Sequence, residues 1–381
     1  MCSLFKAKDM GIDLGTANTL IYVKDTGIIL NEPSVIAVEN RGGKTLAVGL
    51  KAKEMLGKAP QNISVVRPLQ DGVISDFDRT ADMLKSFLEA ALKAKRIRNF
   101  RVVVGVPSGV TEVEKRAVSE VVKQLGATDV FILEEPMAAA IGAGMDVDGT
   151  TGCMIADIGG GTTDVAIIAL GGIVCSTSIR HAGDKINDEI IQYMRKRHAL
   201  LIGERTAEEL KINIGCACMD VDENGNEIIK TMNARGRDIV SGLPKTLEVT
   251  NKDMMIALQE SMDIIVDAVK ATIEKAPPEI AADIAENGMV LSGGGGRIHN
   301  LDKLITKRTG MEVAVAGNAF EAVALGAGKS LEDVEKLKVY ASGDLRDSAT
   351  ERYRYVIGNN HKQGWKGEVR AHQRCGDTSA M

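Results

Sequence analysis

Short apolar runs alternate with stretches of helical periodicity along the first third of the chain. Apolar runs bounded by glycine and asparagine predict strands, whereas apolar positions every three or four residues predict amphipathic helices. By these criteria we predict strands over residues 11–14, 20–23, 102–106 and 130–133, and helices over residues 84–92 and 113–125. Strands that alternate with helices at this spacing predict an α/β fold.

The alternation continues further along the chain. We predict helices over residues 200–214, 253–275 and 319–331 and a strand over residues 289–291. The prolines at 277 and 278 end the second of these helices, because proline cannot continue a helix interior. Residues 340–381 hold few aliphatic side chains and no sustained period, so we expect a tail that is disordered or folds only against a partner.

One short motif occurs twice. Residues 12–19 read Ile-Asp-Leu-Gly-Thr-Ala-Asn-Thr and resemble residues 156–163, which read Ala-Asp-Ile-Gly-Gly-Gly-Thr-Thr. In each copy an apolar strand ends in Asp, an apolar residue and Gly, and small or hydroxyl residues lead into another strand. Asp13 and Asp157 lie 144 positions apart, about one domain length. The repeat predicts two related halves, each with the same hairpin.

Such turns suit a phosphate ligand. Glycine lets backbone N–H groups approach an anion closely, and successive amides form a concave anion site. Carboxylates repel phosphate but can hold Mg²⁺, generally through its waters. Two facing turns could clamp a triphosphate, whereas a single glycine-rich hairpin is more often only a tight turn. The chain has no GxxxxGK[ST] loop and no GxGxxG after the glycines at 293–296, so the P-loop and dinucleotide folds are poorly supported.

Composition removes several other function classes. The chain of 381 residues has 47 basic and 52 acidic residues, a net charge of −5 and 3% aromatic residues, which gives no electrostatic or stacking reason to expect nucleic acid. The longest uncharged run, residues 165–179, is shorter than a bilayer span. Six cysteines without a CxxC pair favour reduced thiols over zinc, and we expect a cytoplasmic protein.

Several motifs together resemble the MreB/Mbl family of bacterial actin-like proteins, over about residues 9–338. Residues 11–19 are similar to the family's first phosphate motif and residues 157–164 to its second. Residues 134–142 resemble its first connecting helix, 203–211 its ribose-binding helix, 292–301 its adenine motif and 321–326 its second connecting segment. Phosphate motifs alone would fit actins, sugar kinases and heat-shock ATPases equally, whereas the sequences around Glu135 and Lys211 favour this family.

The resemblance implies a role for each matching residue. Asp13 and Asp157 would organise Mg²⁺, and Glu135 and Thr162 would position the water that attacks the γ-phosphate. ATP would be held by Thr16, Ala17, Asn18, Gly160, Gly161 and Thr162 at the phosphates, by Glu208, Glu209, Leu210 and Lys211 at the ribose, and by Gly293, Gly294, Gly295 and Gly296 at the adenine.

Simpler interpretations stand beside these roles. Glu135 could be a carboxylate favoured at a helix N-terminus, Glu208 and Lys211 could be an exposed helical pair, and Thr162 could be a turn residue. The histidines at 181, 198 and 299 show no ligand or triad spacing, and we expect them to be non-catalytic.

The chain also departs from the family pattern. Arg297 and His299 follow the adenine glycines where relatives commonly have leucine- or alanine-type residues, and residues 317–320 lack the usual acidic residue and proline. The apolar membrane loop expected near residues 97–100 is short and basic over residues 95–101, although basic residues beside apolar ones can favour an anionic membrane surface. The last 42 residues match nothing in the family.

The resemblance implies an actin-like ATPase fold with two duplicated α/β domains around a nucleotide cleft. We expect large subdomains over residues 9–30 with 77–145 (and part of 319–338) and over 146–183 with 251–318, and small ones over 31–76 and 184–250. The implied function is a weak ATPase that forms filaments with itself and maintains rod shape by organising cell-wall synthesis. The implied partners are the wall-synthesis machinery and the cytoplasmic face of the inner membrane. The alternatives are a small-molecule kinase, for which no acceptor site is evident, and a chaperone ATPase, for which the short polar tail supplies no peptide-binding domain.

Overall fold

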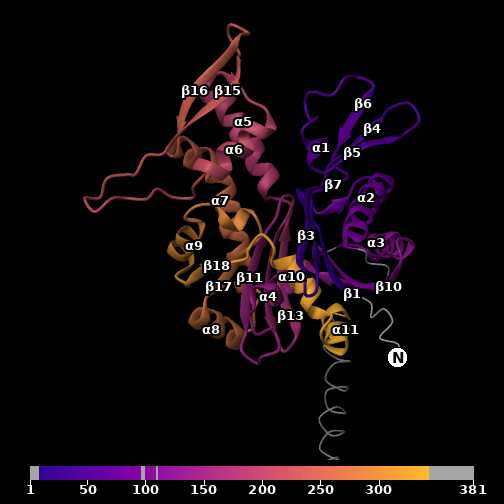
Figure 1. Cartoon of the computed structure of the whole chain (residues 1–381). Helices are drawn as coiled ribbons and strands as arrows, with labels where there is room; N and C mark the ends of the chain where they lie inside the picture. The colour runs from indigo at the N-terminus through magenta and orange to yellow at the C-terminus, as the bar shows by residue number, and fades with distance from the viewer. Residues whose placement is uncertain (1–7, 96–98, 109, 343–381) are drawn as a thin grey trace, which may run out of the picture. The chain divides into compact units, whose positions relative to one another are not determined.

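The computed structural model describes residues 8–95, 99–108 and 110–342 (Figure 1). It contains two five-stranded sheets built by the same rule. The first sheet has the order β10-β9-β1-β2-β3 and the second has the order β13-β12-β11-β17-β18. In each sheet three consecutive strands form an antiparallel meander, and two later strands add in parallel beside the first strand of that meander. The duplicated topology confirms the α/β fold and explains the repeated motif.

The strands follow the apolar runs of the sequence closely. The first sheet comprises β1 (Lys8–Leu14), β2 (Asn18–Val23), β3 (Gly27–Pro33), β9 (Phe100–Val106) and β10 (Ala127–Glu134). The second comprises β11 (Cys153–Ile158), β12 (Thr163–Ala169), β13 (Gly172–Ile179), β17 (Met289–Ser292) and β18 (Val313–Val315).

Two smaller sheets lie at the top of Figure 1, each beyond one of the larger sheets. Their orders are β5-β4-β6 and β14-β15-β16. The first is formed by β4 (Ile36–Glu39), β5 (Thr45–Val48) and β6 (Ile63–Val66), with helix α1 (Leu50–Lys53). The second is formed by β14 (Leu200–Leu201), β15 (Thr231–Asp238) and β16 (Pro244–Thr250), with helices α5 (Gly183–His198) and α6 (Glu204–Ile214). We propose that each small sheet forms the centre of one of the two small subdomains. A further short hairpin, β7 (Leu69–Gln70) and β8 (Val73–Ile74), follows β6.

Helices cover both faces of each large sheet, because alternate strand residues point to opposite faces. One face of the first sheet packs on α2 (Phe77–Lys95) and α3 (Glu112–Gln124). The corresponding face of the second sheet packs on α7 (Asn251–Glu274) and α9 (Leu301–Thr309), and α8 (Pro278–Asn287) lies against β11. Residues of α5 and α6 belong to the same hydrophobic cluster.

Between the two large sheets lie α4 (Glu135–Ala143) and α10 (Ala322–Ser330). The helix α4 leaves the first sheet and packs on β11 and β12, whereas α10 leaves the second sheet and packs on β1 and β9. Their backbones touch: a β-carbon built on Gly326 would stand 1.8 Å from the Ala138 carbonyl oxygen, and one built on Gly142 would stand 1.9 Å from that of Ala322. These glycines, which lower the helix propensity of the sequence, are therefore required by the crossing.

Two predicted elements differ from the structure. The predicted helix over 200–214 is wrong at its start, because Leu200–Leu201 pairs with β15 and the helix begins only at Glu204, after Gly203. The predicted tail begins too early, because α11 (Val334–Ser342) includes Tyr340, whose hydroxyl donates to Asp148 at 2.9 Å. The rest of that tail and residues 96–98 of the basic loop lie outside the described residues. No helix in the described ranges is both long and apolar enough to cross a membrane.

Candidate functional site

The two repeated hairpins meet at one cavity of about 470 Å³. In both hairpins the Asp lies one residue before the last paired strand residue: Leu14 pairs with Thr19, and Ile158 pairs with Thr163. The turn of the β1–β2 hairpin contributes Gly15, Thr16, Ala17 and Asn18 to the lining, and the turn of the β11–β12 hairpin contributes Gly159, Gly160, Gly161 and Thr162.

The turns are in contact across the base of the cavity. A β-carbon built on Gly161 would stand 2.6 Å from the Thr16 hydroxyl oxygen, and the Thr16 hydroxyl accepts a hydrogen bond from the Gly72 amide at 3.2 Å. Glycine is needed here for close approach, since neither Gly160 nor Gly161 has a positive φ. The arrangement presents glycine-rich backbone from both halves of the chain to one space, as the repeat predicted.

Acidic side chains gather beside these turns. Glu135 and Asp157 are buried and line the cavity together with Asp13. Burial, followed by the nearby charge of Asp157, raises the pKa of Asp13 to about 8. Burial and the charge of Asp164 raise the pKa of Asp157 to about 7, although a hydrogen bond from Ser292 opposes that shift.

The pKa of Glu135 is raised well above its usual range, first by burial and then by the charges of Asp13, Asp164 and Asp157. Three carboxylate oxygens of this group, one each on Glu135, Asp157 and Asp164, are buried without a hydrogen-bond partner. Uncompensated buried carboxylates are costly and call for a cation. Hard oxygen donors suit Mg²⁺. Within the described ranges no three acidic, histidine or cysteine side chains converge closely enough to hold a metal ion by themselves.

Asp164 is a residue that the sequence reasoning missed. It is 1% exposed, and burial raises its pKa to about 6 against opposing hydrogen bonds from Ser178, Thr162 and the Ser108 amide. The Ser108 amide donates to it at 3.2 Å, from the loop that follows β9 in the other half. Its position in the second hairpin, paired with Asp157 across the strands, was the available signal.

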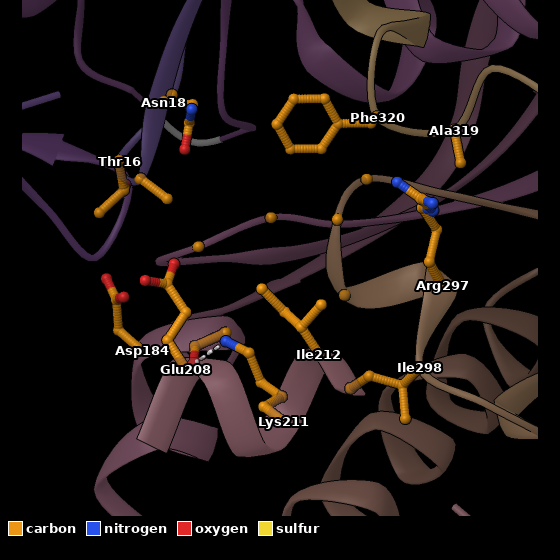
Figure 2. Close-up of a pocket in the computed structure, with 18 of the residues that line it drawn as sticks. Thr16, Asn18, Asp184, Glu208, Lys211, Ile212, Arg297, Ile298, Ala319 and Phe320 are labelled. Atoms are coloured by element: carbon orange, nitrogen blue, oxygen red, sulfur yellow. Dashed lines mark hydrogen bonds between the residues drawn. The ribbon is translucent and has the colours of Figure 1, made fainter. Parts of the chain in front are cut away.

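Helix α6 lines the cavity from the side of Thr16, where Glu208 lies, to Ile212 near Arg297, and the glycine segment after β17 lines the far end (Figure 2). Glu208 and Lys211 lie on one face of α6, and the Lys211 ammonium donates to the Gly183 carbonyl at 2.9 Å. Burial lowers the pKa of Lys211. Glu208 also forms an ion pair with Lys53 at 2.6 Å. Glu208 and Lys211 are therefore more than an exposed pair of side chains on one helix.

Two residues of the predicted ribose site do not reach the cavity. Leu210 is fully buried in the hydrophobic core of the second half, and Glu209 pairs with Arg205 on the outer face of α6. One turn of helix can direct only part of its residues to a ligand, which is why the motif as a whole overstated the site.

The glycines after β17 do approach the cavity. Gly293, Gly294 and Gly295 line it, whereas Gly296 packs on Leu291 and is not part of the lining. Gly293 has a φ of +76°, and a β-carbon there would stand 2.3 Å from the Ile158 carbonyl oxygen. Because of this close approach, the backbone of the glycine segment itself lines this end of the cavity.

Three residues that depart from the family pattern, Arg297, His299 and Phe320, line the cavity near these glycines. Figure 2 shows Arg297, Ile298 and Phe320 at this end, and Ile212 facing them from α6. His299 also lines the cavity and contacts Asp220 at 2.5 Å, outside any triad. The Phe320 ring lies over Gly294, where a β-carbon would come within 3.5 Å of it. Lys230 and Asn251, which sequence reasoning missed, also line the cavity.

Known proteins resemble this chain in both sequence and structure. The MreB/Mbl protein family model matches residues 7–339. The chain is 46% identical over 331 residues to the cell shape-determining protein Mbl of Bacillus subtilis, and this alignment covers 87% of this chain and 98% of Mbl. It is 48% identical over 334 residues to the cell shape-determining protein MreB of Escherichia coli, and this alignment covers 86% of this chain and 94% of MreB.

Solved structures agree with the observed fold. MreB5 of Spiroplasma citri, crystallised with AMPPNP, superposes with a TM-score of 0.81 at 37% identity, covering 87% of this chain and 98% of that protein. Its ADP-bound crystal structure superposes with a TM-score of 0.80 at 39% identity, covering 88% and 98%. The expected actin-like fold and the family resemblance are thereby confirmed, and this chain belongs to the MreB/Mbl family of actin-like proteins.

Proposed function

We propose that this chain binds ATP with Mg²⁺ in the cavity, hydrolyses it slowly to ADP and phosphate, and assembles into filaments that maintain rod cell shape by organising cell-wall synthesis. The observation that carries the proposal is the contact between the two hairpin turns, Gly160 and Gly161 against Thr16 and Ala17, at the base of one shared cavity. The crystal structures of the related MreB5 with AMPPNP and with ADP support the choice of an adenine nucleotide.

The phosphates would lie between the turns. Backbone amides of both turns would donate to phosphate oxygens, as in other glycine-rich anion sites. Bound Mg²⁺ would neutralise charge between the phosphates and the carboxylates of Asp13 and Asp157. The unpaired carboxylate oxygen of Asp157 supports this role.

The base and ribose would extend toward α6. Lys211 and Glu208 line the cavity on α6, where the ribose hydroxyls would lie, and the glycines at 293–295 would take the adenine. Arg297 and Phe320 would contact the base from this end of the cavity, because a guanidinium group and an aromatic ring both stack on planar rings.

Glu135 is suited to act on the attacking water. It starts α4 directly after β10, is 6% exposed, and has one carboxylate oxygen without a hydrogen-bond partner. A raised pKa brings a carboxylate nearer to neutral pH, where a general base works best. Thr162, whose methyl group packs on Gly72, would hold the same water from the opposite turn. Most of the acceleration would come from positioning and charge neutralisation.

Membership of the MreB/Mbl family supports the proposed filament formation and cell-wall role. We propose the cytoplasmic face of the membrane as the site of assembly. Head-to-tail contacts that do not close a ring produce open filaments. The relatives Mbl and MreB are cell shape-determining proteins.

Sedimentation tests this proposal against a kinase on the same fold. We expect the full chain to pellet at high speed with ATP and Mg²⁺ and to release phosphate slowly, with less pellet when EDTA replaces Mg²⁺. Absence of a pellet over a range of protein and salt concentrations, together with phosphorylation of a sugar, would contradict the filament proposal and favour the kinase.

A further inference from the structure

Ion pairs join the two small subdomains across the mouth of the cavity. The Lys53 ammonium, at the end of α1, lies 2.6 Å from the Glu208 carboxylate on α6. The Arg67 guanidinium, just after β6, donates to Asp184 at 3.1 Å and also contacts Glu204. Both cations therefore come from the first half of the chain and all three carboxylates come from the second.

These contacts differ from scattered surface pairs. The side chain of Arg67 is 19% exposed and that of Lys53 is 26% exposed, so solvent screens them less than a fully exposed pair. Arg67 binds two carboxylates from different helices, which fixes its guanidinium group in one orientation. Among the described residues, α1 and β4–β6 share no extensive packing with α5, α6 or β14–β16. Contact between the small subdomains thus rests largely on charge.

The same helix α6 carries the residues expected at the ribose. Glu204 and Glu208 lie one turn apart, and Lys211 lies one turn further on the side of the cavity. Figure 2 shows Asp184 and Glu208 at the end of the cavity where Thr16 and Asn18 lie, away from Arg297. A cation from the first half that holds Glu208 or Glu204 therefore fixes the position of α6 relative to the phosphate turns.

We propose that Arg67 and Lys53 are positioning residues that clamp α6 to the first half of the molecule and thereby slow the release of bound nucleotide. The clamp acts through Glu204, Asp184 and Glu208 and needs no contact of Arg67 with the nucleotide. This inference rests on the proposed nucleotide binding, but the closed state of the clamp can be measured without nucleotide.

The central measurement is the dissociation rate of a fluorescent ADP analogue from the full chain with Mg²⁺. We expect Arg67→Ala, which removes two partly buried ion pairs, to release the analogue about five- to thirtyfold faster than wild type. Arg67→Lys retains the charge and should recover part of this loss. The matched control is Arg308→Ala, which removes an ion pair of 2.7 Å to Asp263 within the second half and should change the rate less than twofold.

A double-mutant cycle separates the clamp from a general loss of packing. Glu204 does not line the cavity, so Glu204→Ala should accelerate release only through Arg67. The double variant Arg67→Ala/Glu204→Ala should then be about as fast as Arg67→Ala alone, because a broken pair cannot be broken twice. Fully additive effects would overturn the proposed coupling.

Energy transfer between dyes at Lys44 and Lys196, introduced on non-natural residues, reports the separation of the small subdomains without nucleotide. We expect Arg67→Ala, or added salt in wild type, to lower the transfer efficiency, and Arg308→Ala to leave it unchanged. If wild type bound no nucleotide, the proposed function would be wrong. The dye measurement would still show whether Arg67 holds the small subdomains together. Unchanged dye separation and unchanged release in Arg67→Ala, with folding verified by circular dichroism, would overturn the clamp.

Discussion

Gly160 and Ala17 lie against one another although they belong to different halves of the chain: a β-carbon built on Gly160 would stand 2.6 Å from the Ala17 β-carbon. The turns of the two repeated hairpins are thus in direct contact. A side chain at position 160 could fit only if the turns moved apart.

Gly160→Ala should therefore lower nucleotide affinity at least tenfold, since separated turns cannot direct their amides at the same phosphates. Equilibrium titration with a fluorescent ATP analogue measures this loss. Gly317→Ala is the matched control, because a β-carbon at Gly317 meets nothing within 4 Å. Equal affinity of Gly160→Ala and wild type would contradict the role of this contact.

Glu135→Ala should slow phosphate release by about 10²–10⁴-fold, the contribution typical of general acid–base catalysis. ATP affinity should change only a few-fold, because Glu135 lies beside the two hairpin turns and does not belong to either of them. Single-turnover phosphate release and ATP titration measure the two effects separately. A parallel loss of affinity and hydrolysis would assign Glu135 to binding or folding.

The clustered carboxylates predict how stability depends on pH without Mg²⁺ and nucleotide. The folded-state pKa values of Asp164, Asp157 and Asp13 are raised to about 6, 7 and 8. The folded protein then holds protons that the unfolded chain releases above about pH 4. Stability from these groups is complete below that pH and is lost as pH rises through 6 to 8.

Between pH 6 and pH 8 we expect the free energy of unfolding to fall by an amount on the order of 2–4 kcal/mol. Urea unfolding at several pH values measures it. Asp157→Asn removes one titrating group and should give a shallower dependence on pH. A slope identical to wild type would show that Asp157 is already ionised in the free protein.

The contact between α4 and α10 gives a prediction about stability. Gly326→Ala would place a methyl group 1.8 Å from the Ala138 carbonyl oxygen, so the helices must separate. We expect a loss of about 1–3 kcal/mol or more in the free energy of unfolding, as in other overpacked cores. Gly317→Ala is again the control, because a β-carbon there meets nothing within 4 Å and position 317 lies outside the helices and strands. An unchanged urea midpoint in Gly326→Ala would contradict the close crossing.

The strands and the two glycine-rich hairpin turns could be predicted because their signals are local. Apolar runs ended by Asp-x-Gly mark β1 and β11 directly, and the repeat of that motif implies the duplicated sheet. The start of α6 could not be placed, because Leu200 and Leu201 are apolar at helical spacing but pair with β15, a partner distant in the sequence.

The sequence motifs also could not predict which way individual side chains point or which residues pair across the two halves of the chain. Leu210 matches the ribose-binding motif but points into the core, whereas Asp164 matches no assigned role and yet faces the other half through Ser108. The pairing of Lys53 with Glu208 spans 155 positions and depends on how the halves meet, which no local pattern encodes.

The crossing of α4 and α10 gives the molecule a pivot. Because moving these backbones apart would disturb the packed interior around them, we expect relative motion of the halves to be mainly a rotation about this crossing. The displacement in such a rotation grows with distance from the pivot. The outlying residues Arg67 and Glu204 would then travel much further than Gly160 and Ala17, so a small adjustment around the phosphates would become a large change in the outer surfaces available to a neighbouring molecule.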